Sequence, residues 1–174
     1  LRLTTRIAHS RPLVELGERQ DVPLKPYEKN PAKNVMLPAF AKPKHVKVEE
    51  RTCALREWSE TSGINRIENN GASVGVIASG AVYQYAREAL GDSVNYLKLG
   101  MVHPLPDSLL LEFAAANETV YVIEELDDFI ESHCKSLGMK VIGKDLFPRC
   151  GEFSQNLIRR LMDRPLPESV RLET

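Results

Sequence analysis

The sequence has 174 residues with a net charge of −1, and 43% of them are hydrophobic. This length suffices for one domain with a substantial core, and no apolar run approaches the ~20 residues of a membrane span, so we expect a soluble protein. The three cysteines form no C-x-x-C pair, which argues against a disulfide framework and indicates a reducing, cytoplasmic compartment. The chain opens on a leucine without a signal-peptide pattern, and therefore looks like part of a larger protein.

Residues 1–47 are basic and rich in proline. They hold ten Lys and Arg against four Asp and Glu, a charge of +6, which leaves −7 for the remainder. Six of the eleven prolines lie here, and because each fixes φ and removes a backbone donor, we predict an extended connector instead of a regular helix. A nucleic-acid arm is the alternative, but Tyr27 and Phe40 are its only aromatics, so we expect no nucleic-acid partner.

A helix is predicted over residues 48–62. The stretch "VKVEERTCALREWSETSG" places Val48, Leu55 and Trp58 on one face, and Gly63 is a suitable stop.

From residue 71 onward the pattern alternates between short β-rich runs and amphipathic helices. The predicted strands are 74–79, 95–100, 119–125 and 140–143, and the predicted helices are 81–90, 106–117, 127–137 and 155–163. Because parallel strands need crossovers of a dozen or more residues, this spacing predicts an α/β domain with a mostly parallel sheet. Asn117 and Gly138 suit helix C-termini, while Pro106 and Ser154 suit helix starts.

The run "VGVIASGAVYQYAREAL" joins a strand to a helix at Ser79 and Gly80. It matches neither the dinucleotide fingerprint nor the phosphate-binding loop, because the Lys and Ser/Thr of that loop are replaced by Ala81 and Val82. An anion could still rest at the helix start. We favour the simpler interpretation, in which Ser79 caps the helix and Gly80 allows close packing of strand and helix.

Parallel sheets place binding groups at the carboxyl ends of their strands. The polar residues expected there are Ser79, Gly80, His103, Glu124, Glu125 and Lys144. Adjacent residues on a strand point to opposite faces, so Glu124 and Glu125 do not form a catalytic pair. The four histidines are too scattered for a metal cluster. The residues alone therefore indicate an α/β binding or assembly domain.

The order of three segments, "VGVIASGAVYQYAREAL", "NYLKLGMVHPLPDSLLLEFA" and "TVYVIEELDDFIE", resembles the C-terminal domain of transketolase-type thiamine diphosphate enzymes. That resemblance implies a three-layer α/β/α fold. More closely, "LRLTTRIAHSR", "VMLPAFAKPKHVKVEER", "LKLGMVHPLP", "VIEELDDFIE" and "VIGKDLFPRCGEFS" resemble the alpha subunit of indolepyruvate ferredoxin oxidoreductase over all but residues 165–174. The chain departs from that family at His103, where an aromatic is common, and at Asp128, where a proline is common.

The resemblance implies a larger cytoplasmic enzyme that oxidatively decarboxylates aryl-2-oxoacids to acyl-CoA on thiamine diphosphate and passes electrons through 4Fe-4S clusters to ferredoxin. The family's G-D-G and Asn motif for Mg²⁺ and its Cys-rich cluster motifs are missing from this sequence, so we expect no cofactor in this chain and a noncatalytic, structural role. Its partners would be other domains of the same subunit, a beta subunit and ferredoxin. A free-standing small-ligand or nucleotide-binding α/β protein is the alternative.

The resemblance also implies three parts. Residues 1–10 would be the last strand of a preceding pyrimidine-side domain, residues 11–47 a linker, and residues 48–174 the transketolase-C-like domain with its leading helix. An orphan strand in the first part could pair with a second copy, giving a homodimer. Arg6 and His9 would lie in the catalytic half of the enzyme, where Arg6 suits an oxoacid carboxylate and His9 could orient a polar group.

Overall fold

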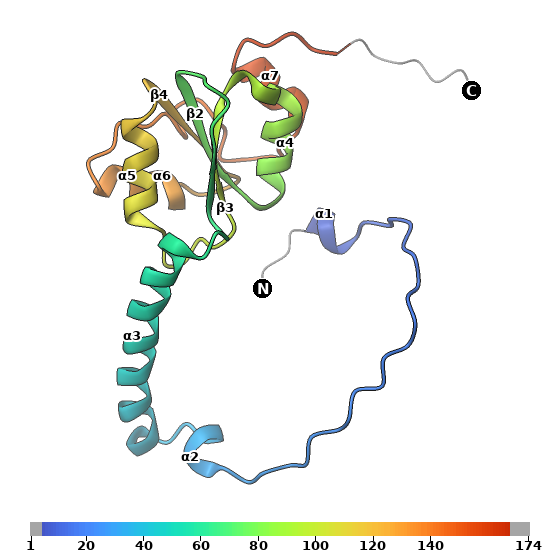
Figure 1. The fold of residues 1–174 in the computed structure, drawn as a ribbon, viewed down its shortest axis with the longest axis vertical. Helices are drawn as coiled ribbons and strands as arrows, with labels where there is room; N and C mark the ends of the chain where they lie inside the picture. The colour runs from blue at the N-terminus through green and yellow to red at the C-terminus, as the bar shows by residue number, and fades with distance from the viewer. Residues whose placement is uncertain (1–4, 168–174) are drawn as a thin grey trace. The chain divides into compact units, whose positions relative to one another are not determined.

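Figure 1 shows the computed structural model, which describes residues 5–167. The chain divides into two units, one ending at Phe40 and one beginning at Ala41. The second unit holds the sheet and the hydrophobic core.

The first unit contains two single-turn helices and a long irregular segment. Helix α1 spans Thr5–Ala8 and helix α2 spans Pro31–Asn34, with no helix or strand between them. The strand predicted over residues 1–10 is therefore a helix turn at 5–8, while residues 1–4 lie outside the described part. The bond from His9 N to Thr5 O, 2.9 Å long, is local and needs no partner strand, which explains the difference.

Helix α3 spans Pro38–Thr61 and begins ten residues before the predicted start at 48. The prediction that prolines exclude a helix throughout residues 1–47 is wrong for 38–47. Pro38 is the first helical residue, where no backbone donor is needed, although Pro43 does lie inside the helix. The predicted stop is confirmed, because Gly63 follows the helix with φ +73°. The predicted apolar face is exposed, however, and Trp58 keeps 48% of its surface.

Four strands form one sheet in the order β1-β3-β2-β4. They are β1 (Arg66–Glu68), β2 (Val74–Ser79), β3 (Asn95–Leu99) and β4 (Thr119–Ile123). The pairs of β2 with β3 and with β4 are parallel, as predicted, whereas β1 pairs antiparallel with β3 and was not predicted. The strand predicted over 140–143 is reduced to a parallel bridge between Tyr121 and Ile142. The α/β class with a mostly parallel sheet is confirmed.

Helices cover both faces of the sheet. They are α4 (Gly80–Leu90), α5 (Asp107–Ala115), α6 (Phe129–Ser136) and α7 (Gln155–Leu161), and a 3₁₀ turn, η1, spans Gly91–Ser93. Helices α4 and α7 lie on one side of the sheet, and α5 and α6 lie on the other (Figure 1). Alternate residues of β2 divide accordingly, since Val76 packs with the first pair and Ile77 with the second. These are the three layers that the resemblance implied.

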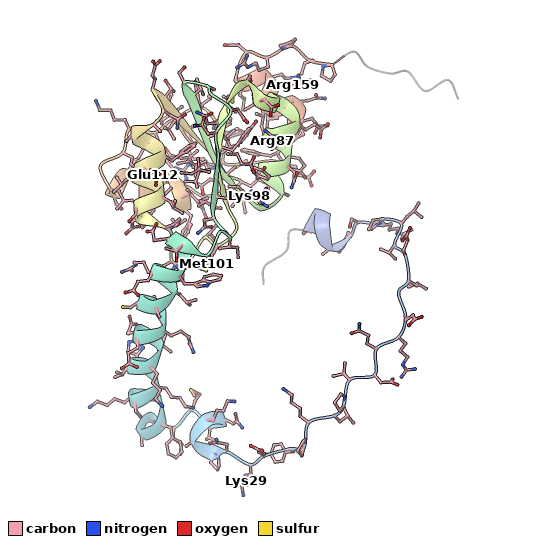
Figure 2. The ribbon with its side chains drawn as sticks, in the orientation of Figure 1. Lys29, Arg87, Lys98, Met101, Glu112 and Arg159 are labelled. Atoms are coloured by element: carbon pink, nitrogen blue, oxygen red, sulfur yellow. The ribbon has the colours of Figure 1, made fainter. Side chains whose placement is uncertain are left out.

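One polar side chain joins α3 to the carboxyl end of β3. Asn65 is buried, and its Oδ1 accepts hydrogen bonds from Gly100 N and Met101 N, each 2.9 Å long. Its Nδ2 donates to Ser59 O at 3.1 Å, near the end of α3. Figure 2 labels Met101 at this junction. The last turn of α3 is thereby fixed to the sheet.

Several turn residues have the predicted roles. Ser154 caps α7 by accepting a hydrogen bond from Leu157 N, 3.2 Å long. Ser79 occupies the N-cap position of α4 but makes no capping hydrogen bond with its side chain. Gly80 has φ +55° and open space around it, so it meets a backbone requirement and not the predicted packing one. Close approach is required at Gly75 instead.

We expect Gly75→Ala to destabilise the fold. An added Cβ would lie 2.7 Å from Phe113 Cε1 and 2.9 Å from Asn117 Cγ, and the Phe113 ring is buried in the core. Overpacking of this kind lowers the free energy of unfolding by about 1–3 kcal/mol. Urea denaturation measures the change, with Gly17→Ala as the control because nothing lies within 4 Å of its added Cβ. Equal stability of the two variants would contradict the packing seen here.

Candidate functional site at the carboxyl edge of the sheet

The sheet has a topological switch point beside β2. From β2 the chain crosses to β3 on one side, and from β3 it returns to β4 on the other. In open α/β sheets, ligands bind at the carboxyl ends of the strands where the order reverses in this way. Here Ser79 and Gly80 follow β2, while Glu124 and Glu125 follow β4. A binding site is therefore expected at this edge of the sheet.

Glu124 is buried and binds the start of α6. Its carboxylate accepts hydrogen bonds from Ile130 N and Glu131 N, each 2.9 Å long. A carboxylate at this position satisfies two backbone donors that have no partner inside the helix and interacts favourably with the helix dipole. Burial nevertheless raises the pKa of Glu124 above its ordinary value. The residue anchors a helix.

Glu125 binds on the opposite side of the strand. Its Oε1 accepts a hydrogen bond from the backbone N–H of Phe153, 3.1 Å away, just before α7. Phe153 itself is fully buried in the core cluster beneath α4 and α7. The prediction that the two adjacent glutamates point to opposite faces is therefore confirmed, and each fixes a different helix layer.

Lys144 lies against the same strand end and completes this network. Its Nζ donates to the backbone carbonyl of Glu124 and lies 5.5 Å from the centre of the Phe153 ring. Its backbone N–H donates to Glu131 Oε2 at 2.7 Å. Burial lowers the pKa of Lys144, as expected for an ammonium group partly removed from water.

Glu131 is a second buried carboxylate, and sequence reasoning did not find it. Burial alone would raise its pKa, but hydrogen bonds from Lys135 Nζ, at 2.5 Å, and from Lys144 N outweigh that effect and lower it. An added Cβ on Gly143 would lie 2.3 Å from Glu131 Oε2, so the chain passes close over this carboxylate. The apolar spacing of α6 gave no signal for a buried acid.

Within the described residues, Ser79 and His103, also predicted at the strand ends, form no hydrogen bond or ion pair with this network. His103 is exposed in the turn after β3, and Ser79 is partly buried without a capping contact. His9 is exposed in the first unit, and Arg6 lies in α1 with its side chain outside the described part.

Burial raises the pKa of Cys134 to about 12, so its thiol stays protonated at neutral pH. Within residues 5–167, no three His, Cys, Asp or Glu side chains gather in a way that could hold a metal ion. The same stretch contains no helix long and apolar enough to cross a lipid bilayer. Of the polar residues at the strand ends, Glu124, Glu125 and Lys144 instead bind backbone groups of the domain itself.

No protein-family model matches the sequence. Curated relatives do match it. Indolepyruvate oxidoreductase subunit IorA of Methanothermobacter marburgensis is 36% identical over 92% of this chain, and the same subunit of Pyrococcus horikoshii is 39% identical over 88%. The chain is similar to IorA subunits over almost its whole length. It spans only 28% and 26% of these two proteins, however, so most of each relative lies outside the match.

A solved structure supports the fold. The 2-oxoglutarate:ferredoxin oxidoreductase of Magnetococcus marinus superposes on 74% of this chain with a TM-score of 0.55 and 20% identity, and the match covers 23% of that protein. The resemblance expected from the sequence motifs is confirmed by these matches.

We expect Glu124→Gln to change how stability depends on pH. The folded-state pKa of Glu124 lies above its ordinary value of 4.5, so ionisation lowers stability as the pH rises from that value through the raised one. The amide does not ionise, and its NH₂ group only donates, so it leaves one of the two backbone N–H groups without an acceptor, whereas both oxygens of the protonated acid can accept. The variant should therefore be less stable by ~1 kcal/mol near pH 4, with a deficit that shrinks as the pH rises.

Urea denaturation at several pH values between about 4 and 8 measures this difference. Glu57→Gln on the exposed surface of α3 is the matched control, and it should show no such trend. A deficit for Glu124→Gln that grows with pH would contradict the burial effect.

Proposed function

We propose that this chain is a noncatalytic structural domain of a larger indolepyruvate oxidoreductase subunit. In this proposal the complete enzyme oxidatively decarboxylates aryl-2-oxoacids to acyl-CoA on thiamine diphosphate and reduces ferredoxin. Two findings support it: the similarity to IorA subunits over about nine tenths of the chain, and the fact that the chain spans about a quarter of their length.

The observation that supports a structural role is that polar groups at the strand ends bind the domain's own backbone. Glu124, Glu125 and Lys144 lie where an α/β domain binds its ligand, yet each is hydrogen-bonded to a backbone group of this domain. A carboxylate already accepting from two backbone N–H groups is poorly placed to act as a general base. The edge that could be a site instead locks the helices to the sheet.

The described residues do not fit the cofactors that the complete enzyme would use. Thiamine diphosphate is held through Mg²⁺, which needs a set of oxygen ligands, and a 4Fe-4S cluster needs four thiolates. The chain has three cysteines in all, and Cys134 is buried against the sheet while Cys53 and Cys150 are exposed. In this proposal the cofactors bind other parts of the subunit, and no reaction step is assigned to this chain.

The proposal also assigns the parts of the chain and its partners. Residues 1–10 would belong to a preceding pyrimidine-side domain, residues 11–37 would cross between domains, and α3 would lead into the transketolase-C-like domain. The partners would be the other domains of the subunit, a beta subunit and ferredoxin, in the cytoplasm.

Calorimetry tests the division of labour within the subunit. We expect thiamine diphosphate with Mg²⁺ to release binding heat with the complete enzyme and none with the 174-residue chain, because residues 5–167 gather no carboxylate set for the metal. The folded state of the chain is checked beforehand by its cooperative unfolding. Micromolar binding by the isolated, folded chain would overturn the noncatalytic assignment.

Arg6 and His9 remain the candidates for a substrate role. In the complete enzyme we expect Arg6→Ala to raise KM for the oxoacid about tenfold or more, since the loss of a charge-assisted hydrogen bond is worth ~1.5–3 kcal/mol. Arg11→Ala is the matched control in the same basic segment, and His9→Ala tests the neighbouring position. A lower melting temperature with unchanged KM would mean instead that Arg6 only docks domains.

A further inference from the structure

A small cavity opens where α3, α5 and α6 meet. It is lined by Arg56 of α3, the turn Val102–Leu105 after β3, Asp107 of α5, and Phe129 and His133 of α6. Its volume is about 260 Å³. We call it the Pro104 pocket. None of its lining residues belongs to the hydrogen-bond network of Glu124, Glu125, Glu131 and Lys144.

Two contacts fix the walls of the Pro104 pocket. The Glu60 carboxylate, at the end of α3, accepts hydrogen bonds from Ser108 N at 2.9 Å and Leu109 N at 3.0 Å. On the other side, His133 Nε2 and Asp107 Oδ1 lie 2.7 Å apart and join α6 to α5. The cavity is therefore formed by elements already tied together, and a ligand would meet a preorganised surface.

The lining of the pocket combines an apolar interior with a polar rim that holds the Arg56 guanidinium, the His103 ring and the paired Asp107 and His133. Pro104 and Leu105 are buried, whereas Val102 and Phe129 keep 37% and 54% of their surface at the rim. Within the described part of the chain, no carboxylate pairs with the Arg56 guanidinium or the His103 ring. Three residues before Phe129, Leu126 is 65% exposed and has φ +60°, a conformation that leucine rarely adopts.

The size of the cavity indicates what it holds. Small-molecule sites are usually about 300–1,000 Å³, so 260 Å³ is small for a substrate or cofactor but sufficient for one side chain. An unpaired guanidinium beside an apolar pocket favours an apolar side chain with a carboxylate next to it. One such anchor would not hold a separate protein, because stable interfaces bury about 1,000 Å² or more.

We propose that the Pro104 pocket is an intramolecular docking site. It receives one apolar side chain, with an adjacent carboxylate placed by Arg56 and His103, from a part of the same subunit outside these 174 residues. Covalent linkage raises the effective concentration of that segment, so a single anchor is sufficient. The inference rests on the proposed function, because nearly three quarters of the length of each IorA relative lies outside the matched region.

Photo-crosslinking in the complete enzyme tests the proposal. Phe129, which is 54% exposed at the rim, is replaced by p-benzoylphenylalanine, whose added benzoyl group is photoreactive, and the crosslinked peptides are identified by mass spectrometry. We expect a crosslink to an acidic and apolar segment of the same subunit. The same replacement at Leu111, which is 46% exposed on α5, is the control and should not give that crosslink. Crosslinks only to a second copy or to another subunit, or none at all, would overturn the proposal.

A charge reversal tests the role of Arg56. In the crosslinking background, Arg56→Glu should lower the crosslink yield severalfold, whereas Arg160→Glu, at an exposed position on α7, should leave it unchanged. An unchanged yield with Arg56→Glu would remove the carboxylate from the proposal. The crosslink is read without turnover, so the two proposals can fail separately. If the same-subunit crosslink forms in an enzyme that is inactive on aryl-2-oxoacids, the proposed function alone is overturned. If the crosslink is absent from an active enzyme, the docking site alone is overturned.

Discussion

The two adjacent carboxylates at the end of β4 hold the layers of this domain together. Because neighbouring strand residues point to opposite faces, Glu124 binds the start of α6 on one side and Glu125 binds the chain entering α7 on the other. The Lys144 ammonium group donates a hydrogen bond to the Glu124 backbone carbonyl, and the Lys144 backbone N–H donates to the Glu131 carboxylate. Burial of Glu124 and Glu131 and partial burial of the Lys144 ammonium group disfavour folding unless each is hydrogen-bonded, and here each is.

This arrangement explains how a fold associated with ligand binding can serve as an assembly domain. The carboxyl edge of the sheet has the topology of a binding site, but Glu124, Glu125 and Lys144 at this edge are hydrogen-bonded within the domain. In the proposed role, the surface that is left for partners lies elsewhere: on α3, whose apolar side chains are exposed, and at the Pro104 pocket, where the Arg56 guanidinium has no carboxylate partner within the described residues.

The sequence predicted the regular part of this fold well and the interactions between elements poorly. Period-two and helical patterns located β2, β3, β4 and the four helices that cover them, because those patterns report burial. The short antiparallel β1 was missed, since three residues are too few for a pattern. The start of α3 was missed because two prolines were taken as breakers: Pro38, which is tolerated at a first turn, and Pro43, which lies inside the helix. Buried polar partners such as Glu131 and Asn65 depend on tertiary contacts with distant backbone groups, which local spacing does not encode.

The central claim is that the strand-end acids hold structure and take no part in catalysis. Its most direct test compares Glu125→Ala with Glu125→Gln in the complete enzyme, measuring the melting temperature together with kcat and KM for the oxoacid. Only the glutamine retains an oxygen that can accept from Phe153 N. The account predicts that Glu125→Ala lowers the melting temperature, that Glu125→Gln largely restores it, and that both keep the kinetic constants. A large loss of kcat in Glu125→Gln at an unchanged melting temperature would contradict it, because the charge itself would then be catalytic.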